Sequence, residues 1–157
     1  MGKSFIVSLD EAFESGSLNG PHFYDLAFLS QTQQETLFTF IAAVSCGAIL
    51  QGKNKPSWEN NDLSDAAYCQ TYKALQCWHY HCGPGYRSGR VHRFTYDLRR
   101  NLYGSTSKAS IHYRKVADTD GEIEVLILGF APKHTSPEFP RSDKPGLAHP
   151  LFDRPSH

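Results

Sequence analysis

Hydrophobic and polar side chains alternate through residues 77–82, which read Cys-Trp-His-Tyr-His-Cys. In a β-strand, successive side chains point to opposite faces, so alternation separates two kinds of surface. The faces would hold Cys77, His79 and His81 on one side and Trp78, Tyr80 and Cys82 on the other. The pattern predicts a strand with one face for chemistry and one face for packing.

Two further strand-like segments follow in the C-terminal half. Residues 110–115 place His112 and Arg114 on one face, and residues 123–130 are almost continuously apolar. The sequence Asp-Thr-Asp-Gly at 118–121 is typical of a turn, so residues 109–116 and 123–130 are predicted to pair as an antiparallel hairpin. Because residues 125–128 are all apolar, we expect this strand to be covered on both faces.

The N-terminal half is predicted to hold one strand, at residues 4–9, and two helices. Ser30 and Gln33 form a capping-box pattern ahead of an apolar stripe that we expect to end near Gly52. The stripe consists of Leu37, Phe40, Ile41, Val44 and Ala48. Residues 53–57 are predicted to be a turn, and Asp62 or Ser64 to cap a second helix that runs to about Gln76. Two helices with a short link would form a helical hairpin over one side of the sheet.

These elements predict one α+β domain over residues 1–135, with the N-terminal strand and the helical hairpin packed on a small, mainly antiparallel sheet. The 157 residues suffice to bury a core without metal or disulfides. Prolines recur through residues 136–157, which predicts an irregular tail.

Cysteine usage and hydropathy indicate a cytoplasmic protein. No signal peptide precedes the four cysteines, Cys46, Cys69, Cys77 and Cys82, so we expect reduced thiols. The most apolar helix candidate, residues 37–50, is shorter than the roughly 20 residues of a membrane span.

Charge is distributed unevenly although the formal net charge is zero. Residues 1–76 have a net charge of −4 and residues 77–157 a net charge of +4, with seven of the eight histidines in the second part. The segment 83–108 is basic and aromatic: it carries Arg87, Arg90, Arg93, Arg99, Arg100 and Lys108, interleaved with Tyr86, Phe94, Tyr96 and Tyr103. This composition suits either a nucleic-acid surface or a solvated loop whose aromatic rings anchor it to the core.

The clustered residue types fit RNA cleavage by transesterification. A base removes the 2′-hydroxyl proton, an acid protonates the leaving 5′ oxygen, and cations stabilise the charge on the phosphorane. Histidine can perform either proton transfer near neutral pH, and arginine matches the phosphate oxygens. The candidate catalytic residues are His79, His81, His112, Arg114 and His134. The candidate phosphate-binding residues are Arg87, Arg90, Arg93, Lys108 and Lys133. This chemistry requires no metal and no cofactor.

Two other interpretations remain open. Cys77, His79 and His81, together with His112 or His134, could bind Zn²⁺ and form a hydrolase, although the paired Cys-x-x-Cys spacing of structural zinc sites is absent. The same basic face could also belong to a non-catalytic RNA- or protein-binding module, in which each histidine is a hydrogen-bonded strand residue.

The predicted order of one strand, a helical hairpin and three strands resembles the RelE/ParE-like toxin superfamily. The C-terminal half is most similar to YafO-type mRNA interferases. Three features carry this resemblance: the His79-Tyr80-His81 strand, the Thr106-Ser107 turn before the strand with His112, and the Pro132-Lys133-His134 end of the last strand. The long segment 87–103 and the proline-rich tail depart from that pattern.

The resemblance implies a toxin of a toxin–antitoxin system that cleaves mRNA on the ribosome and is neutralised by a cognate antitoxin protein. The family positions that match are the His-x-His pair, His112 and His134. The assignments of Arg87, Arg114 and Lys133 come from the chemistry of phosphate stabilisation.

Overall fold

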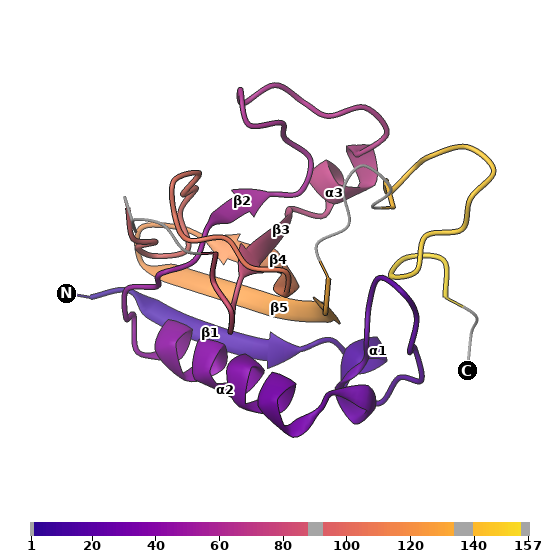
Figure 1. The fold of residues 1–157 in the computed structure, drawn as a ribbon. Helices are drawn as coiled ribbons and strands as arrows, with labels where there is room; N and C mark the ends of the chain where they lie inside the picture. Colours follow the sequence, from indigo (N-terminus) through magenta and orange to yellow (C-terminus); the bar gives the residue numbers. More distant parts are fainter. Residues whose placement is uncertain (1, 88–92, 134–139, 155–157) are drawn as a thin grey trace.

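The computed structural model describes residues 2–87, 93–133 and 140–154. Its helices and strands, in chain order, are β1 (Ser4–Leu9), α1 (Glu11–Glu14), the 3-10 helix η1 (Leu26–Phe28), α2 (Gln31–Ser45), β2 (Asn54–Pro56), α3 (Gln70–Ala74), β3 (Cys77–His81), β4 (Ser110–Asp118) and β5 (Glu122–Ala131). The chain therefore has an α+β fold (Figure 1). In the described part of the chain, no helix is long and apolar enough to cross a membrane.

The described strands form one mixed sheet in the order β1-β5-β4-β3-β2. β1 is parallel to β5, and every other neighbouring pair is antiparallel, which confirms a mainly antiparallel sheet. The predicted strands at residues 4–9 and 77–82 and the β4–β5 hairpin are confirmed. In β5, Val125 and Ile127 are fully buried but Leu126 and Leu128 are only half-buried, so the expected cover on both faces is incomplete.

Helix α2 begins at the predicted capping box. The Ser30 hydroxyl accepts a hydrogen bond from the Gln33 amide at 3.1 Å, and the Gln33 side chain accepts one from the Ser30 amide at 2.8 Å. The helix ends at Ser45, before the expected end near Gly52, because Gly47 has a φ of +68° that a helix cannot continue through.

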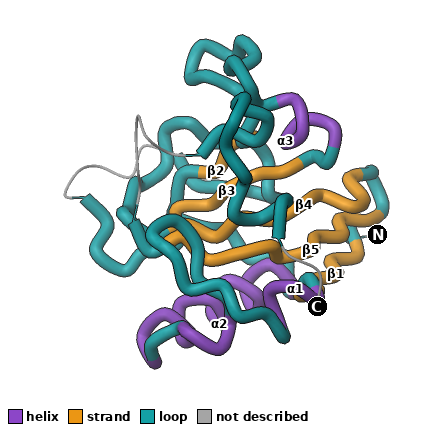
Figure 2. Tube along the Cα trace, turned by 90° about the vertical axis from the view of Figure 1, so that its right-hand side faces the viewer, coloured by secondary structure: helices purple, strands orange, loops and turns teal. Residues whose placement is uncertain are grey.

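The predicted helical hairpin is wrong. Asp62 accepts a hydrogen bond from the Ser64 amide at 3.0 Å, which makes a tight turn and leaves no helix to cap, and Leu63 has a φ of 73°. Only the short α3 forms, at Gln70–Ala74. Figures 1 and 2 place α2 on one side of the sheet and α3 on the other. Residues 54–56, which were predicted to lie in a turn, pair with β3 as an edge strand.

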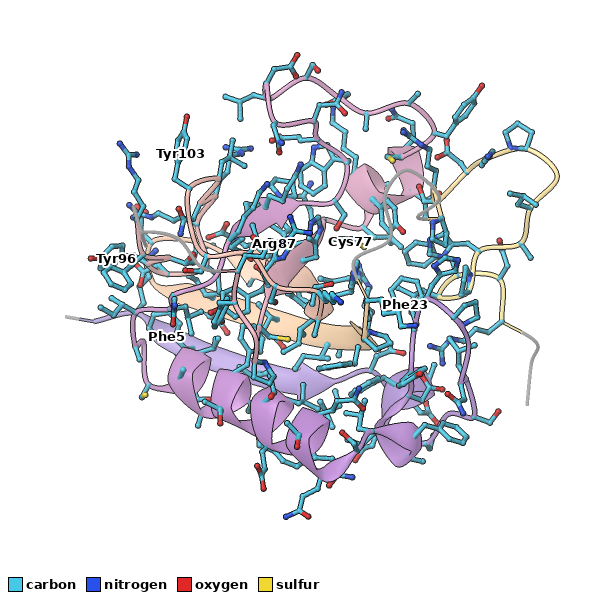
Figure 3. The ribbon with its side chains drawn as sticks, viewed as in Figure 1. Phe5, Phe23, Cys77, Arg87, Tyr96 and Tyr103 are labelled. Carbon is cyan, nitrogen blue, oxygen red and sulfur yellow. The ribbon has the colours of Figure 1, made fainter. Side chains whose placement is uncertain are left out.

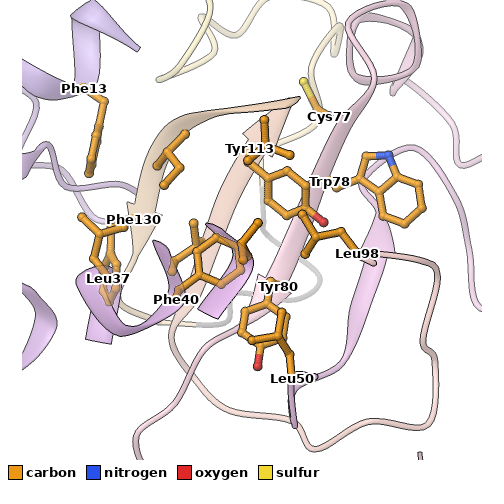
Figure 4. Packing of buried hydrophobic residues seen from close by; sticks show 14 of the residues in the cluster. Phe13, Leu37, Phe40, Leu50, Cys77, Trp78, Tyr80, Leu98, Tyr113 and Phe130 are labelled. Carbon is orange, nitrogen blue, oxygen red and sulfur yellow. The ribbon is translucent and has the colours of Figure 1, made fainter. Parts of the chain in front are cut away.

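The hydrophobic core lies between α2 and one face of the sheet. Phe40 of α2 stacks on Tyr80 of β3 with ring centroids 5.1 Å apart and lies 6.1 Å from the ring of Tyr113 in β4 (Figure 4). Leu37 and Val44 extend the same helix face into the core. Since Tyr80 alternates with His79 and His81, packing this face leaves the histidines on the opposite one.

Residues 140–154 form no helix or strand, and they pack back onto the N-terminal region (Figure 1). The Arg154 guanidinium binds both carboxylate oxygens of Asp25, at 2.9 and 3.1 Å, and donates to the Ala12 carbonyl at 2.7 Å. Asp25 is fully buried and also accepts a hydrogen bond from the Leu18 amide. A Cβ at Gly16 would lie 2.1 Å from the Asp25 carboxylate, so this packing requires glycine there.

Removing the Arg154 side chain is expected to destabilise the protein strongly. Arg154→Ala leaves the buried Asp25 carboxylate without its counter-charge, a change that typically costs about 3–5 kcal/mol. Urea unfolding measures this loss, and Lys144→Ala, an exposed cation of the same segment, is the control. Equal stability of the two variants would show that the Arg154–Asp25 pair does not hold the segment in place.

Candidate active site

Three histidines meet on the sheet face opposite α2. His79 of β3 lies directly across from His112 of β4 in the strand register. Their rings stack with centroids 5.4 Å apart, and the His79 and His81 rings are 5.8 Å apart. The predicted gathering of these side chains on one face is therefore present.

Each histidine contacts a hydroxyl or backbone group that fixes its ring. His79 Nδ1 lies 2.9 Å from the Ser57 hydroxyl, and His112 Nε2 lies 3.3 Å from the Ser110 hydroxyl. Phe23 packs edge-on against the His112 ring. His112 is only 3% exposed and His81 only 4%, whereas His79 is half-buried, so His79 is the most accessible of the three.

The Nδ1 atom of His81 has a hydrogen-bond partner in either protonation state. It lies 3.0 Å from the Ser107 carbonyl oxygen and 3.2 Å from the Ser107 amide nitrogen. A protonated Nδ1 donates to the carbonyl, and an unprotonated Nδ1 accepts from the amide. The His81 ring can therefore change its protonation without losing its anchor at Nδ1.

The three histidines line a pocket of about 780 Å³ whose other walls are strongly basic. Its cationic lining residues, among those described, are Lys53, Lys55, Arg87, Lys108, Lys133 and Arg141. Glu59 is the only carboxylate among the described lining residues, and Arg100 pairs with it at 2.8 Å. The pocket therefore has a net positive potential suited to an anion such as a phosphate.

Lys53 and Lys55 are functional candidates that the sequence analysis missed. Lys53 lies just before the edge strand β2 and Lys55 lies within it. Both ammonium groups contact the Asn61 side-chain oxygen, at 3.4 and 3.1 Å. Burial lowers the pKa of both lysines, and the nearby Lys53 lowers the pKa of Lys55 further. The Lys-x-Lys spacing was the available signal, because alternate residues of an extended segment share a face.

The predicted site residues divide into three groups. Arg87, Lys108 and Lys133 line the pocket with the histidines, and Arg87 lies over the sheet in Figure 3. Arg114 lies outside the pocket lining and donates from Nε to the Leu75 carbonyl at 3.0 Å, while Arg93 lines a separate groove. Arg90 and His134 lie outside the described residues.

The described residues of the candidate zinc site are poorly suited to hold a metal. Burial raises the pKa of the Cys77 thiol to about 12, which disfavours the thiolate that zinc requires. Within residues 2–87, 93–133 and 140–154, no group of three or more His, Cys, Asp or Glu side chains could hold a metal ion. All four cysteines are free thiols.

The C-terminal segment closes one wall of the pocket through Tyr72 of α3. His149 Nδ1 accepts a hydrogen bond from the Leu151 amide at 3.0 Å, so the ring proton is on Nε2. Nε2 then donates to the Tyr72 hydroxyl at 2.6 Å, and this hydroxyl donates to the Pro140 carbonyl at 3.2 Å. This chain of bonds requires a neutral His149.

Comparison with known proteins finds no relative: no protein-family model matches the chain, and neither does any curated protein or any solved structure.

Acidification is expected to weaken the fold through His149. Burial lowers the pKa of His149 from 6.5 to about 4, so between these values the unfolded chain binds a proton that the folded chain does not. The contribution of neutral His149 to the free energy of unfolding is complete above the pKa of the unfolded chain. It falls by up to about 1.4 kcal/mol per pH unit as the pH drops toward the pKa of the folded chain.

Urea unfolding over this pH range measures the effect, and His149→Gln isolates it from the other histidines. The variant should lose stability less steeply with falling pH, since it lacks one titrating group. Parallel profiles for the two proteins would show that His149 does not carry the effect.

Proposed function

We propose that the chain is an endoribonuclease that cleaves RNA by attack of the 2′-hydroxyl on the adjacent phosphate, without a metal ion. The observation that supports this proposal is the packing of His79, His81 and His112 in a pocket with six cationic side chains. Proton transfer and stabilisation of a phosphorane are the tasks that such a set performs.

The contacts of the three rings suggest different roles. His79 and His81 would exchange protons with the 2′-hydroxyl and the 5′ leaving oxygen, since His79 is the most accessible and His81 keeps a partner at Nδ1 in both states. His112 would act as a positioning residue, because its ring stacks on His79 and packs edge-on against Phe23. Lys53, Lys55 and Arg87 would hold the phosphate.

We further propose that the protein is a RelE-like toxin that acts on mRNA at the ribosome. Support comes from the His-x-His strand and from the order of β1, α2, β3, β4 and β5 along the chain. The described residues depart from the superfamily pattern in having one long helix, α2, in place of the helical hairpin. An antitoxin with an acidic segment would cover the basic pocket, where opposite charge favours its docking.

A non-catalytic RNA-binding module is the second candidate. The observation in its favour is the nearly complete burial of His81 and His112, which is typical of structural histidines. The two functions differ in their response to histidine removal, because a binding module has no cleavage to lose.

Replacing both histidines proposed for proton transfer is expected to abolish cleavage while leaving RNA binding largely intact. His79→Ala/His81→Ala removes the proposed acid and base, each of which contributes about 10²–10⁴-fold to a rate. Cleavage of one mRNA is followed in EDTA, both during translation and free in solution. The wild type and the double variant are compared with His22→Gln, which replaces a histidine outside the pocket lining.

The proposal requires that the wild type and His22→Gln cleave the RNA and that the double variant does not. Cleavage limited to the translated mRNA supports the ribosome-dependent class. Intact RNA in every reaction, with folded protein free of antitoxin, would contradict the endoribonuclease, and undiminished cleavage by the double variant would contradict the assigned residues.

A further inference from the structure

A second groove lies beside the histidine pocket, on the segment that follows residue 92. This groove has a volume of about 890 Å³. Its lining residues are Asn61, Asp62, Leu63, Arg93, Phe94, Tyr96, Arg99, Arg100, Asn101, Leu102 and Tyr103. Asn61 also lines the histidine pocket, so the two hollows adjoin at this residue.

The segment that forms the groove is firmly anchored although it has no helix or strand. Thr95 and Leu50 exchange two backbone hydrogen bonds, at 2.7 and 2.9 Å, and Asn101 exchanges two with Asn54, at 2.7 and 3.0 Å. The Lys53 amide donates to the Ser105 carbonyl. These bonds fix the backbone of the segment and so the points from which its side chains project.

The anchoring residues point inward while the aromatic rings point outward. Thr95, Leu98 and Asn101 are buried. Phe94 is 45% exposed, Tyr96 56% and Tyr103 62%. Figure 3 shows Tyr96 and Tyr103 projecting from the same end of the molecule. The three rings line one groove, so together they offer an exposed aromatic surface to a ligand.

Arginines accompany these rings. The Arg93 guanidinium lies 5.7 Å from the centre of the Tyr103 ring. Arg100 pairs with Glu59, but no carboxylate of the described residues pairs with the Arg93 or Arg99 guanidinium. Asp62, the one carboxylate among the described lining residues of the groove, accepts hydrogen bonds from Ser64. The groove thus offers two guanidinium groups that have no carboxylate partner among the described residues, next to exposed aromatic rings.

We propose that this groove binds a single-stranded segment of the RNA substrate, next to the phosphate held in the histidine pocket. An unpaired base would stack on Tyr103 or Tyr96, and Arg93 and Arg99 would bind the flanking phosphates. This inference rests on the proposed endoribonuclease function. Aromatic rings with neighbouring arginines are suited to unpaired bases, since a duplex keeps its base faces stacked on one another.

In this proposal the protein binds nucleotides next to the cleaved phosphate as well as the phosphate itself. The pocket would hold one phosphate, and the groove would add contacts to the nucleotides beside it. Stacking is tolerant of base identity because every base has a flat π-face. The groove would therefore select unpaired RNA over duplex RNA without reading its sequence.

The test is the affinity for a short single-stranded RNA with 2′-O-methyl groups throughout, which cannot be cleaved by 2′-hydroxyl attack. Fluorescence anisotropy compares the wild type with Tyr96→Ala/Tyr103→Ala and with Tyr96→Phe/Tyr103→Phe. Phe38→Ala removes a ring that is 50% exposed on α2 and is the matched control. A duplex of the same length is the second ligand.

The alanine pair should weaken single-strand binding about tenfold or more, since loss of a stacked base–ring contact has an effect of this order. The phenylalanine pair and Phe38→Ala should bind as the wild type does. Duplex binding should be weaker and unaffected by the tyrosine changes. In addition, Arg99→Gln should reduce the salt dependence of binding by about one counterion.

The groove proposal is overturned if the wild type does not bind the single strand, or if the alanine pair binds as tightly as Phe38→Ala. Cleavage by the wild type is measured separately. Cleavage with no effect of the tyrosines on binding would reject the groove and keep the endoribonuclease. Stacking-dependent binding without cleavage of any RNA would keep the groove as a single-strand site and reject the enzyme.

Discussion

The side chain of Asn54 is fully buried and makes three hydrogen bonds. Its oxygen accepts a hydrogen bond from the Tyr113 hydroxyl at 2.6 Å, and its amide group donates to the Leu98 and Arg99 carbonyls, both at 3.0 Å. One residue of the edge strand thereby joins the centre of the sheet to the segment after residue 92. A buried polar group left without its partners costs about 1–3 kcal/mol, so these bonds specify one position for that segment.

That constraint determines where both candidate surfaces lie. Lys53 and Lys55 flank Asn54, so the edge strand that is fixed by the buried amide also brings two cations to the histidine pocket. On the other side, Leu98 and Asn101 hold the segment that carries Tyr96 and Tyr103. The Gly104 backbone approaches Gly52 and Lys53 so closely that a Cβ would lie 2.7 Å from them. Pocket and groove are therefore built on a common support.

The sequence predicted the parts of the fold that depend on local patterns. Alternation placed His79 and His81 opposite Tyr80, and the capping box at Ser30 located the start of α2. The edge strand at Asn54 could not be found in this way, because a three-residue strand exists only through its pairing with β3 and its bonds to a distant segment. Asp62 was misleading because the same side chain that caps a helix also closes a turn.

The candidate site shows the same division between local and long-range information. The three histidines were predictable from strand period, since their grouping requires only neighbouring strands. Lys53, Lys55 and Arg141 join the pocket through long-range contacts, and Arg114 lies apart from it because its guanidinium is bonded to the Leu75 carbonyl. Strand alternation predicts the sheet face on which a side chain begins, but not the direction in which a long arginine or lysine side chain extends.

The chemical nature of the RNA ends after cleavage tests the account most directly, because attack by the 2′-hydroxyl and attack by water leave different groups. Mass spectrometry of the products, from a substrate with and without a 2′-deoxy sugar at the cleaved step, distinguishes the two. The account predicts a 2′,3′-cyclic phosphate or 3′-phosphate and a 5′-hydroxyl, with no cleavage at the deoxy step. A 3′-hydroxyl with a 5′-phosphate, or cleavage at the deoxy step, would contradict it.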